Sequence, residues 1–208
     1  YFDRITRPEQ IISSLQHAIQ VMLDPADCGP ACISLSQDVQ GEVYDYPEEF
    51  FKERIHTIRR PKPDDFQIKQ AMEKIKKSKK PIIISGGGVF YSDAMDELGS
   101  FAIKHNIPVT QTVMGYSTMK RDHSHFLGPI GGLGGKAANN LAKETDLAIC
   151  VGTKLADFTT GSWANFENPE FKLVSINIAR HDANKHLAEA VIGDAKVCLS
   201  ELSNSLGN

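Results

Sequence analysis

Two hydrophobic patterns alternate along most of the chain. Unbroken apolar runs, such as residues 82–84 (III), lack a polar face, which is typical of strands covered on both sides in a parallel sheet. Between these runs, apolar residues recur every three or four positions, as in Leu98, Phe101 and Ala102, and this spacing predicts amphipathic helices. Strands are predicted over 82–84, 107–113, 146–151, 172–178 and 190–192, with helices after Asp64, Ser92 and Asp194 and over 137–145. Alternating strands and helices at this spacing predict an α/β fold with a doubly wound parallel sheet.

The first 45 residues hold too few elements to close a core by themselves. Thr6, Pro8 and Glu9 predict a helix start, with Thr6 as the N-cap and Glu9 completing a capping box. Asp24 and the proline after it predict the end of that helix, and a strand is predicted over residues 31–35. The chain also begins at Tyr1 rather than at methionine. We therefore expect residues 1–45 to be a helix-strand remnant of another domain in a longer polypeptide.

Residues 46–64 are the predicted linker between this remnant and the α/β domain, which we assign to residues 65–208. Prolines at 61 and 63 favour an extended backbone, and the stretch has no long periodic pattern. Its aromatic side chains are expected to pin it to a domain surface.

Glycines follow three of the predicted strands, as Gly86–Gly88, Gly115 and Gly152. Open α/β sheets bind nucleotides at the carboxyl ends of their strands, where residues without Cβ let backbone amides approach a ligand. A nucleotide site and a tight turn that binds nothing explain the first of these runs equally well.

A second glycine cluster, residues 131–135, invites two motif assignments. A Walker A loop needs glycine at position 130 and serine or threonine at 137, but Ile130 and Ala137 stand there. Residues 132–137 fit the looser dinucleotide pattern, yet no strand of adequate length precedes them. The cluster predicts a glycine-rich loop that leads from a long polar stretch into the helix at 137–145 and can present amides to a phosphate.

Composition narrows the possible functions of the 208 residues. With a net charge of −3 and a pI near 6.2, the chain lacks the excess of basic residues that nucleic-acid-binding proteins carry, so nucleic acid is not an expected partner. The apolar runs are too short to cross a membrane, and we expect a cytoplasmic protein.

The lysines at 76, 77, 79 and 80 are expected to form a solvated helix end. The four cysteines lack zinc-ligand spacing and no metal residue is assigned. His123 and His125 are expected to be exposed loop residues, and Trp163 a packing or interface residue.

Several sequence segments resemble those of the thiamine-diphosphate enzymes of the acetolactate synthase type, which have pyrimidine-binding, central and diphosphate-binding domains. Residues 32–40 resemble the end of the pyrimidine-binding domain, and residues 81–88, 112–115 and 127–132 resemble strands and loops of the central domain. Residues 146–157 and 172–178 complete a match that covers nearly the whole chain. More narrowly, residues 1–8, 38–47 and 152–163 resemble the branch that opens a cyclic dione by carbon–carbon hydrolysis in myo-inositol catabolism.

The resemblance implies a Rossmann-like central domain of a hydrolase that uses thiamine diphosphate and magnesium. In the family, the activating glutamate and the Gly-Asp-Gly motif lie in the other two domains, and this chain contains no Gly-Asp-Gly run. We therefore assign no catalytic residue here and expect the chain alone to be inactive, with the remaining domains of its own polypeptide as partners in a homo-oligomer.

Flavin-containing relatives use the central domain to hold FAD. If a flavin binds here, the resemblance implies contacts from Gly87, Gly88, Gly115, Gly131 and Lys154. Asn177 and Ala179 stand where a carboxylate would hold a ribose, which disfavours FAD. A stand-alone FAD- or NAD-binding or electron-transfer module is the alternative function, and a spacer that organises a dimer is a third.

Overall fold

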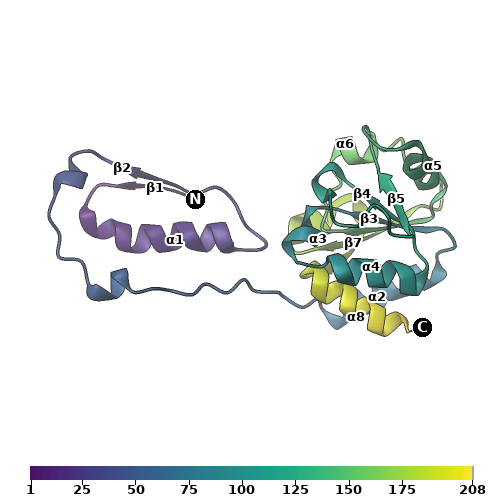
Figure 1. Cartoon of the computed structure of the whole chain (residues 1–208), viewed down its shortest axis with the longest axis horizontal. Coiled ribbons are helices and arrows are strands. Elements are labelled where there is room, and N and C mark those ends of the chain that lie inside the picture. The colour runs from purple at the N-terminus through teal and green to yellow at the C-terminus, as the bar shows by residue number, and fades with distance from the viewer. Residues whose placement is uncertain (208) are drawn as a thin grey trace. The chain divides into compact units, whose positions relative to one another are not determined.

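The computed structural model describes residues 1–207 and divides into two compact units, Tyr1–Arg59 and Arg60–Asn208. The division falls inside the stretch 46–64 that the sequence assigns to a linker. Figure 1 labels many of the helices and strands of the two units, which are described separately below. Within residues 1–207, no helix is both long enough and apolar enough to cross a membrane.

The first unit is a single β-α-β arrangement. Strands β1 (Phe2–Ile5) and β2 (Cys32–Leu35) pair in parallel, with helix α1 (Ile11–Leu23) between them in sequence. Short 3₁₀ turns follow at η2 (Val39–Gly41) and η3 (Glu48–Phe51). In the second half of the unit, the Tyr46 hydroxyl donates to the Pro8 carbonyl at 3.2 Å and its ring stacks on Phe50. These contacts hold the aromatic segment against the unit, as expected.

The predicted start of α1 was wrong in its details. A 3₁₀ turn, η1 (Pro8–Gln10), precedes the helix, and Gln10 rather than Glu9 closes the turn. The Gln10 side-chain oxygen accepts from the Thr6 amide at 2.7 Å and from the Arg7 amide at 2.9 Å. The Thr6 amide therefore donates to the Gln10 side chain, and Thr6 is not the N-cap. The end of the helix before Asp24 is confirmed.

The second unit contains a six-stranded sheet in which every neighbouring pair is parallel. Its strands are β3 (Pro81–Ser85), β4 (Val109–Gln111), β5 (Phe126–Pro129), β6 (Leu147–Val151), β7 (Lys172–Asn177) and β8 (Glu189–Ile192). Its helices are α2 (Asp65–Lys77), α3 (Gly87–Tyr91), α4 (Met95–His105), α5 (Lys136–Glu144), α6 (Asp157–Thr160), α7 (Arg180–Ala183) and α8 (Ala195–Leu206), with 3₁₀ turns η4 (Val113–Gly115) and η5 (Lys185–Leu187). The strand order β5-β4-β3-β6-β7-β8 reverses direction between β3 and β6, so the doubly wound prediction is confirmed.

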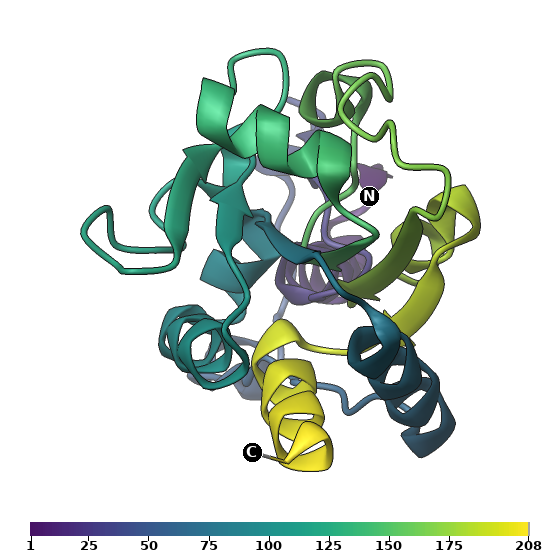
Figure 2. The same ribbon diagram turned by 90° about the vertical axis from the view of Figure 1, so that its right-hand side faces the viewer.

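Apolar side chains cover both faces of this sheet. Helices α2, α4 and α8 cover one face, where Ile83, Phe101 and Leu202 are fully buried, and α5 lies over the other face with Ile82 and Ile84 (Figure 2). The uninterrupted isoleucine run is thus buried on both sides, as predicted.

The thiols divide by burial. Cys28 and Cys32 are exposed, whereas Cys150 and Cys198 are buried. Burial raises the pKa of both buried thiols, that of Cys198 to about 12.

Two helix starts agree with the sequence and one does not. Asp64 accepts from the Phe66 amide at 2.8 Å, and Asp194 accepts from two amides of α8, so both predicted N-caps are confirmed. Ser92, however, ends α3 and does not begin the next helix, which starts at Met95. The glycines after β3 lead directly into the short helix α3. Because they lack a side chain, the turn that they form can lie directly against a neighbouring loop.

Strand β5 was also missed, because its sequence FLGP lies at the end of a stretch assigned to a polar loop. It pairs only with β4, at one edge of the sheet, where glycine and proline are tolerated.

Candidate functional site at the carboxyl edge of the sheet

The predicted site residues lie in the segments that follow the carboxyl ends of the strands. Gly87 and Gly88 follow β3, Gly115 ends η4 after β4, Gly131 follows β5, and Lys154 follows β6. The strand order reverses between β3 and β6, so this edge is where an open α/β sheet forms its ligand crevice. The fold thus brings the five residues to one edge, while their role in binding stays a prediction.

The glycine loops after β3 and β6 pack directly on one another. The Gly88 amide donates to the Gly152 carbonyl at 2.9 Å, and the Gly86 amide donates to the Val151 carbonyl at 2.8 Å. A Cβ at Gly86 would lie 2.4 Å from the Gly152 oxygen, and a Cβ at Gly88 would lie 2.5 Å from the Gly152 Cα. Close backbone approach between two loops therefore requires these glycines, and both amides already have acceptors within the protein.

Gly115 and Gly131 are engaged in the same way. The Gly115 amide donates to Thr112 Oγ1 at 3.0 Å, and a Cβ here would lie 2.2 Å from the Ser85 carbonyl oxygen. Gly131 has a φ of +103° and donates to Asn139 Oδ1 at 3.0 Å. Each glycine therefore closes a turn against a neighbouring segment of its own domain.

Of the polar side chains after β6 and β7, Asn177 is held by internal hydrogen bonds, whereas Lys154 is mostly exposed and makes one long ion-pair contact. Lys154 Nζ lies 3.8 Å from Asp182 Oδ2, and Lys185 Nζ lies 2.5 Å from the other oxygen of that carboxylate. Asn177 donates to the Thr153 carbonyl at 3.1 Å and accepts from the Ala179 amide at 3.0 Å. Asn177 stands where a carboxylate would hold a ribose. Together with the engaged amides of Gly88, Gly115 and Gly131, this weighs against a dinucleotide of the FAD type.

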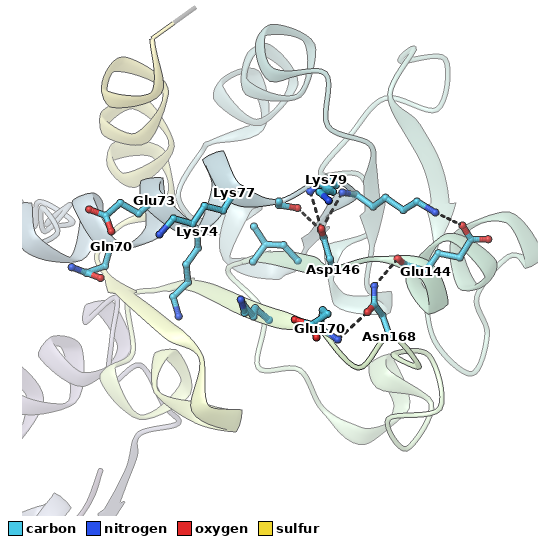
Figure 3. Close-up of a pocket in the computed structure, with 13 residues that line it drawn as sticks. Gln70, Glu73, Lys74, Lys77, Lys79, Glu144, Asp146, Asn168 and Glu170 are labelled. Atoms are coloured by element: carbon cyan, nitrogen blue, oxygen red, sulfur yellow. Dashed lines mark hydrogen bonds and ion pairs between the residues drawn. The ribbon is translucent and has the colours of Figure 1, made fainter.

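A second concave region, of about 630 Å³, lies at the opposite edge of the sheet, beside the amino ends of β3, β6 and β7 (Figure 3). Asp146 is at its centre and accepts hydrogen bonds from Ser78 Oγ and from the backbone amides of Lys79 and Lys80. Burial alone would raise the pKa of Asp146, but these hydrogen bonds outweigh it and lower the pKa. The carboxylate thus fixes the turn between α2 and β3.

Among the other charges around this cavity, Lys80 pairs with Glu144, and Lys74 pairs with Glu189 on β8. Lys80 Nζ lies 2.9 Å from Glu144 Oε2, and this hydrogen bond raises the lysine pKa and lowers the glutamate pKa. Both side chains are more than half exposed, so the pair adds little stability. The sequence did not indicate this cavity, because its walls come from separate segments: Gln70, Glu73, Lys74, Lys77, Ser78, Lys79, Lys80, Glu144, Asp146, Leu147, Asn168, Glu170 and Lys172.

The histidines on the loop before β5 are half-buried, so the expectation of exposure was wrong. His125 Nε2 lies 3.0 Å from Asn106 Oδ1, and the His125 amide donates to His123 Nδ1 at 3.2 Å. These contacts order the loop against the end of α4. Among residues 1–207, no three His, Cys, Asp or Glu side chains are placed to hold a metal ion. Trp163 packs its ring 4.6 Å from the His186 ring, in agreement with a packing role.

Comparison with known proteins agrees with this architecture. The family model described as "Thiamine pyrophosphate enzyme, central domain" matches residues 68–202. The chain is similar to a 3D-(3,5/4)-trihydroxycyclohexane-1,2-dione hydrolase of Clostridium perfringens, with 49% identity over 99% of this chain and 32% of that protein. A protein of the same name from Bacillus subtilis is 47% identical over the same shares. The chain therefore spans about a third of the length of these relatives.

Two solved structures share the fold at low sequence identity. One is a putative thiamin diphosphate-dependent enzyme from Mycobacterium smegmatis, with TM-score 0.75 and 21% identity over 100% of this chain and 39% of that one. The other is benzoylformate decarboxylase from Polynucleobacter necessarius, with TM-score 0.74 and 20% identity over 97% of this chain and 37% of that one. The match to residues 68–202 covers most of the α/β unit and more than half of the sequence. The chain belongs to the family of thiamine pyrophosphate enzyme central domains.

Proposed function

We propose that this chain is the central, non-catalytic part of a longer hydrolase that opens 3D-(3,5/4)-trihydroxycyclohexane-1,2-dione by carbon–carbon bond hydrolysis. The observation that carries the proposal is the 49% identity to such a hydrolase over 206 residues, which include both compact units. Identity of this extent on both sides of the unit boundary favours a common multidomain architecture over a shared central fold alone. Three separate sequence segments also resemble the branch of the family that acts in myo-inositol catabolism, and this resemblance supports the same substrate class.

Catalysis in this proposal depends on parts of the polypeptide outside the chain. Thiamine diphosphate supplies an ylid for carbon–carbon chemistry when bound, and we assign no residue of this chain to that step. A magnesium–diphosphate site needs several oxygen ligands close together, which we place in the other domains. We further propose a homo-oligomeric, cytoplasmic enzyme.

The role of this chain is then structural. Its sheet is buried on both faces, and its carboxyl-edge loops are locked together by backbone hydrogen bonds. Such a rigid body can hold catalytic domains at a fixed separation. The Gly88, Gly115 and Gly131 amides are engaged within the domain, and Asn177 stands in place of a carboxylate. Both observations weigh against the alternative of an FAD- or NAD-binding module.

The test is a ring-opening assay on two proteins, this chain and the complete reading frame that contains it. With thiamine diphosphate and magnesium, we expect the longer polypeptide to consume the cyclic dione and the 208-residue chain to be inactive. The longer polypeptide without thiamine diphosphate is the control. Activity of the short chain, or inactivity of the cofactor-loaded longer polypeptide, would contradict the proposal.

A further inference from the structure

Two turns in the loops that follow β6 and β7 have left-handed backbone at residues other than glycine. Ser162 and Trp163, after α6, have φ of +54° and +68°. His186 and Leu187, on η5, have φ of +59° and +56°. Left-handed backbone brings Cβ close to the next carbonyl oxygen, and residues with a side chain normally adopt it singly. Two consecutive pairs of such residues therefore store conformational strain.

The turn that contains Leu187 has few contacts that offset this strain. Leu187 is 100% exposed, so its side chain contributes no packing. The Ala188 amide donates to the Lys185 carbonyl at 3.1 Å, which closes the turn. The turn at Trp163 is held more firmly, by several backbone hydrogen bonds within residues 157–166. We therefore expect the Leu187 turn to be the part that moves.

One aromatic contact joins the two turns. The Trp163 and His186 rings have centroids 4.6 Å apart and planes at 67°, which is an edge-to-face arrangement. The Trp163 ring also lies 5.6 Å from the ring of Phe166, which packs against the core on the α5 side of the sheet. His186 is thus held against a ring that is anchored in the domain. Strained backbone persists where surrounding contacts fix it, so the Leu187 turn depends on this contact.

The strength of this contact depends on the charge of the histidine. A histidine side chain ordinarily changes charge between about pH 5 and 8. A cation within about 6 Å of the centre of a tryptophan ring is attracted by the ring electrons. The imidazolium form of His186 therefore binds the Trp163 ring more strongly than the neutral imidazole does.

The charges that surround the contact come from the same two loops. The Asp182 carboxylate lies 2.5 Å from Lys185 Nζ and 3.8 Å from Lys154 Nζ, so two lysines already neutralise it. Apart from His186, the charged or titratable side chains of residues 152–166 and 178–188 are Lys154, Asp157, Arg180, His181, Asp182 and Lys185. Of these, only His181 ordinarily titrates in the same pH range as His186, which makes it the natural control.

We propose that the Trp163–His186 contact is a pH-sensitive latch between the loops that follow β6 and β7. Protonation of His186 tightens the latch. Deprotonation loosens it and lets the strained turn at Leu187 open. Because both loops belong to the carboxyl edge of the sheet, the latch makes the mobility of that edge depend on pH.

Amide hydrogen exchange followed by NMR tests the latch on the 208-residue chain. The Ala188 amide is the probe, because opening of the turn breaks its hydrogen bond to Lys185. After correction for the intrinsic pH dependence of exchange, its protection should rise roughly two- to fivefold from about pH 8 to about pH 5.5, as an exposed cation–π contact implies. His186→Gln should abolish this rise. His181→Gln, at an exposed position on α7, is the matched control and should preserve it.

A second variant, Leu187→Gly, separates strain from charge. Glycine adopts positive φ without the Cβ penalty, so this variant should raise the protection at both pH values and keep the pH-dependent rise. Equal protection at the two pH values, or a fall on acidification, would overturn the latch. So would a rise that persists in His186→Gln. A parallel change in the amides of β6 would trace the effect to the whole domain and would overturn the latch as well.

Discussion

Asp194 is expected to be the most sensitive single carboxylate in the stability of the α/β unit. Its side chain is 4% exposed and has two tasks. One oxygen accepts from the Lys196 amide at 3.0 Å and the Val197 amide at 3.3 Å, which caps α8. The other oxygen lies 3.0 Å from Arg60 Nη1, so the same residue holds the entering chain.

Each task has a separate cost when Asp194→Ala removes the side chain. Loss of an N-cap costs about 1 kcal/mol. Loss of the ion pair adds about 1–2 kcal/mol, because Arg60 is 36% exposed and retains partial solvation and its bond to Ser92. The free energy of unfolding should therefore fall by about 2–3 kcal/mol, whereas Asp194→Asn, which keeps a capping oxygen, should lose about 1 kcal/mol.

Chemical denaturation followed by fluorescence of Trp163, the single tryptophan, reports this change within the second unit. Asp64→Ala is the matched control, because Asp64 caps α2 with a 2.8 Å bond to the Phe66 amide and is exposed. It should cost about 1 kcal/mol. An Asp194→Ala variant no less stable than Asp64→Ala would refute the double role of Asp194.

Three further predictions concern the glycine loops, the amino-edge carboxylate and the thiols. Gly88→Ala should lower the free energy of unfolding by about 2–3 kcal/mol, because its Cβ would lie 2.5 Å from the Gly152 Cα. Gly41→Ala is the control, because nothing lies within 4 Å of its Cβ. Equal stabilities of the two variants in chemical unfolding would contradict the packing argument. The pKa of Asp146 is lowered in the folded protein, so its contribution to stability is present above the ordinary value of 3.8 and is lost as the pH falls through the lowered value. Urea unfolding at stepped pH should accordingly show a steeper acid loss for the native protein than for Asp146→Asn, and parallel curves would count against this contribution. A thiol reagent should label the two exposed cysteines at once and the two buried cysteines only after unfolding. Intact-mass spectrometry would record the number of labels. Rapid labelling of all four cysteines would contradict the burial of Cys150 and Cys198.

Local pattern was sufficient to predict the strands buried on both faces. The isoleucine run of β3 and the apolar run of β6 have no polar face, and only a parallel sheet with helices on both sides accommodates several such strands. The caps at Asp64 and Asp194 were predictable for a similar reason, since a capping side chain bonds amides two or three residues away.

Elements formed by distant contacts were not predictable from pattern. Strands β1 (FDRI) and β5 (FLGP) carry charges, glycine or proline, and each exists because a partner strand lies beside it. The glycines after β3 were recognised as special, but their purpose depends on the Gly88–Gly152 hydrogen bond between two loops far apart in sequence. The edge of the sheet was therefore predictable, whereas the internal hydrogen bonds of the Gly88 and Gly115 amides became evident only in three dimensions.

Titration calorimetry with thiamine diphosphate and magnesium on the 208-residue chain tests the central claim most directly. We assign the cofactor site to domains outside this chain, and the Gly86, Gly88 and Gly115 amides at the carboxyl edge already have acceptors within the protein. We predict no binding heat above that of dilution with this chain, and saturable binding with the longer polypeptide under the same conditions. Tight, stoichiometric binding to the 208-residue chain would contradict the assignment of this chain as a non-catalytic central part.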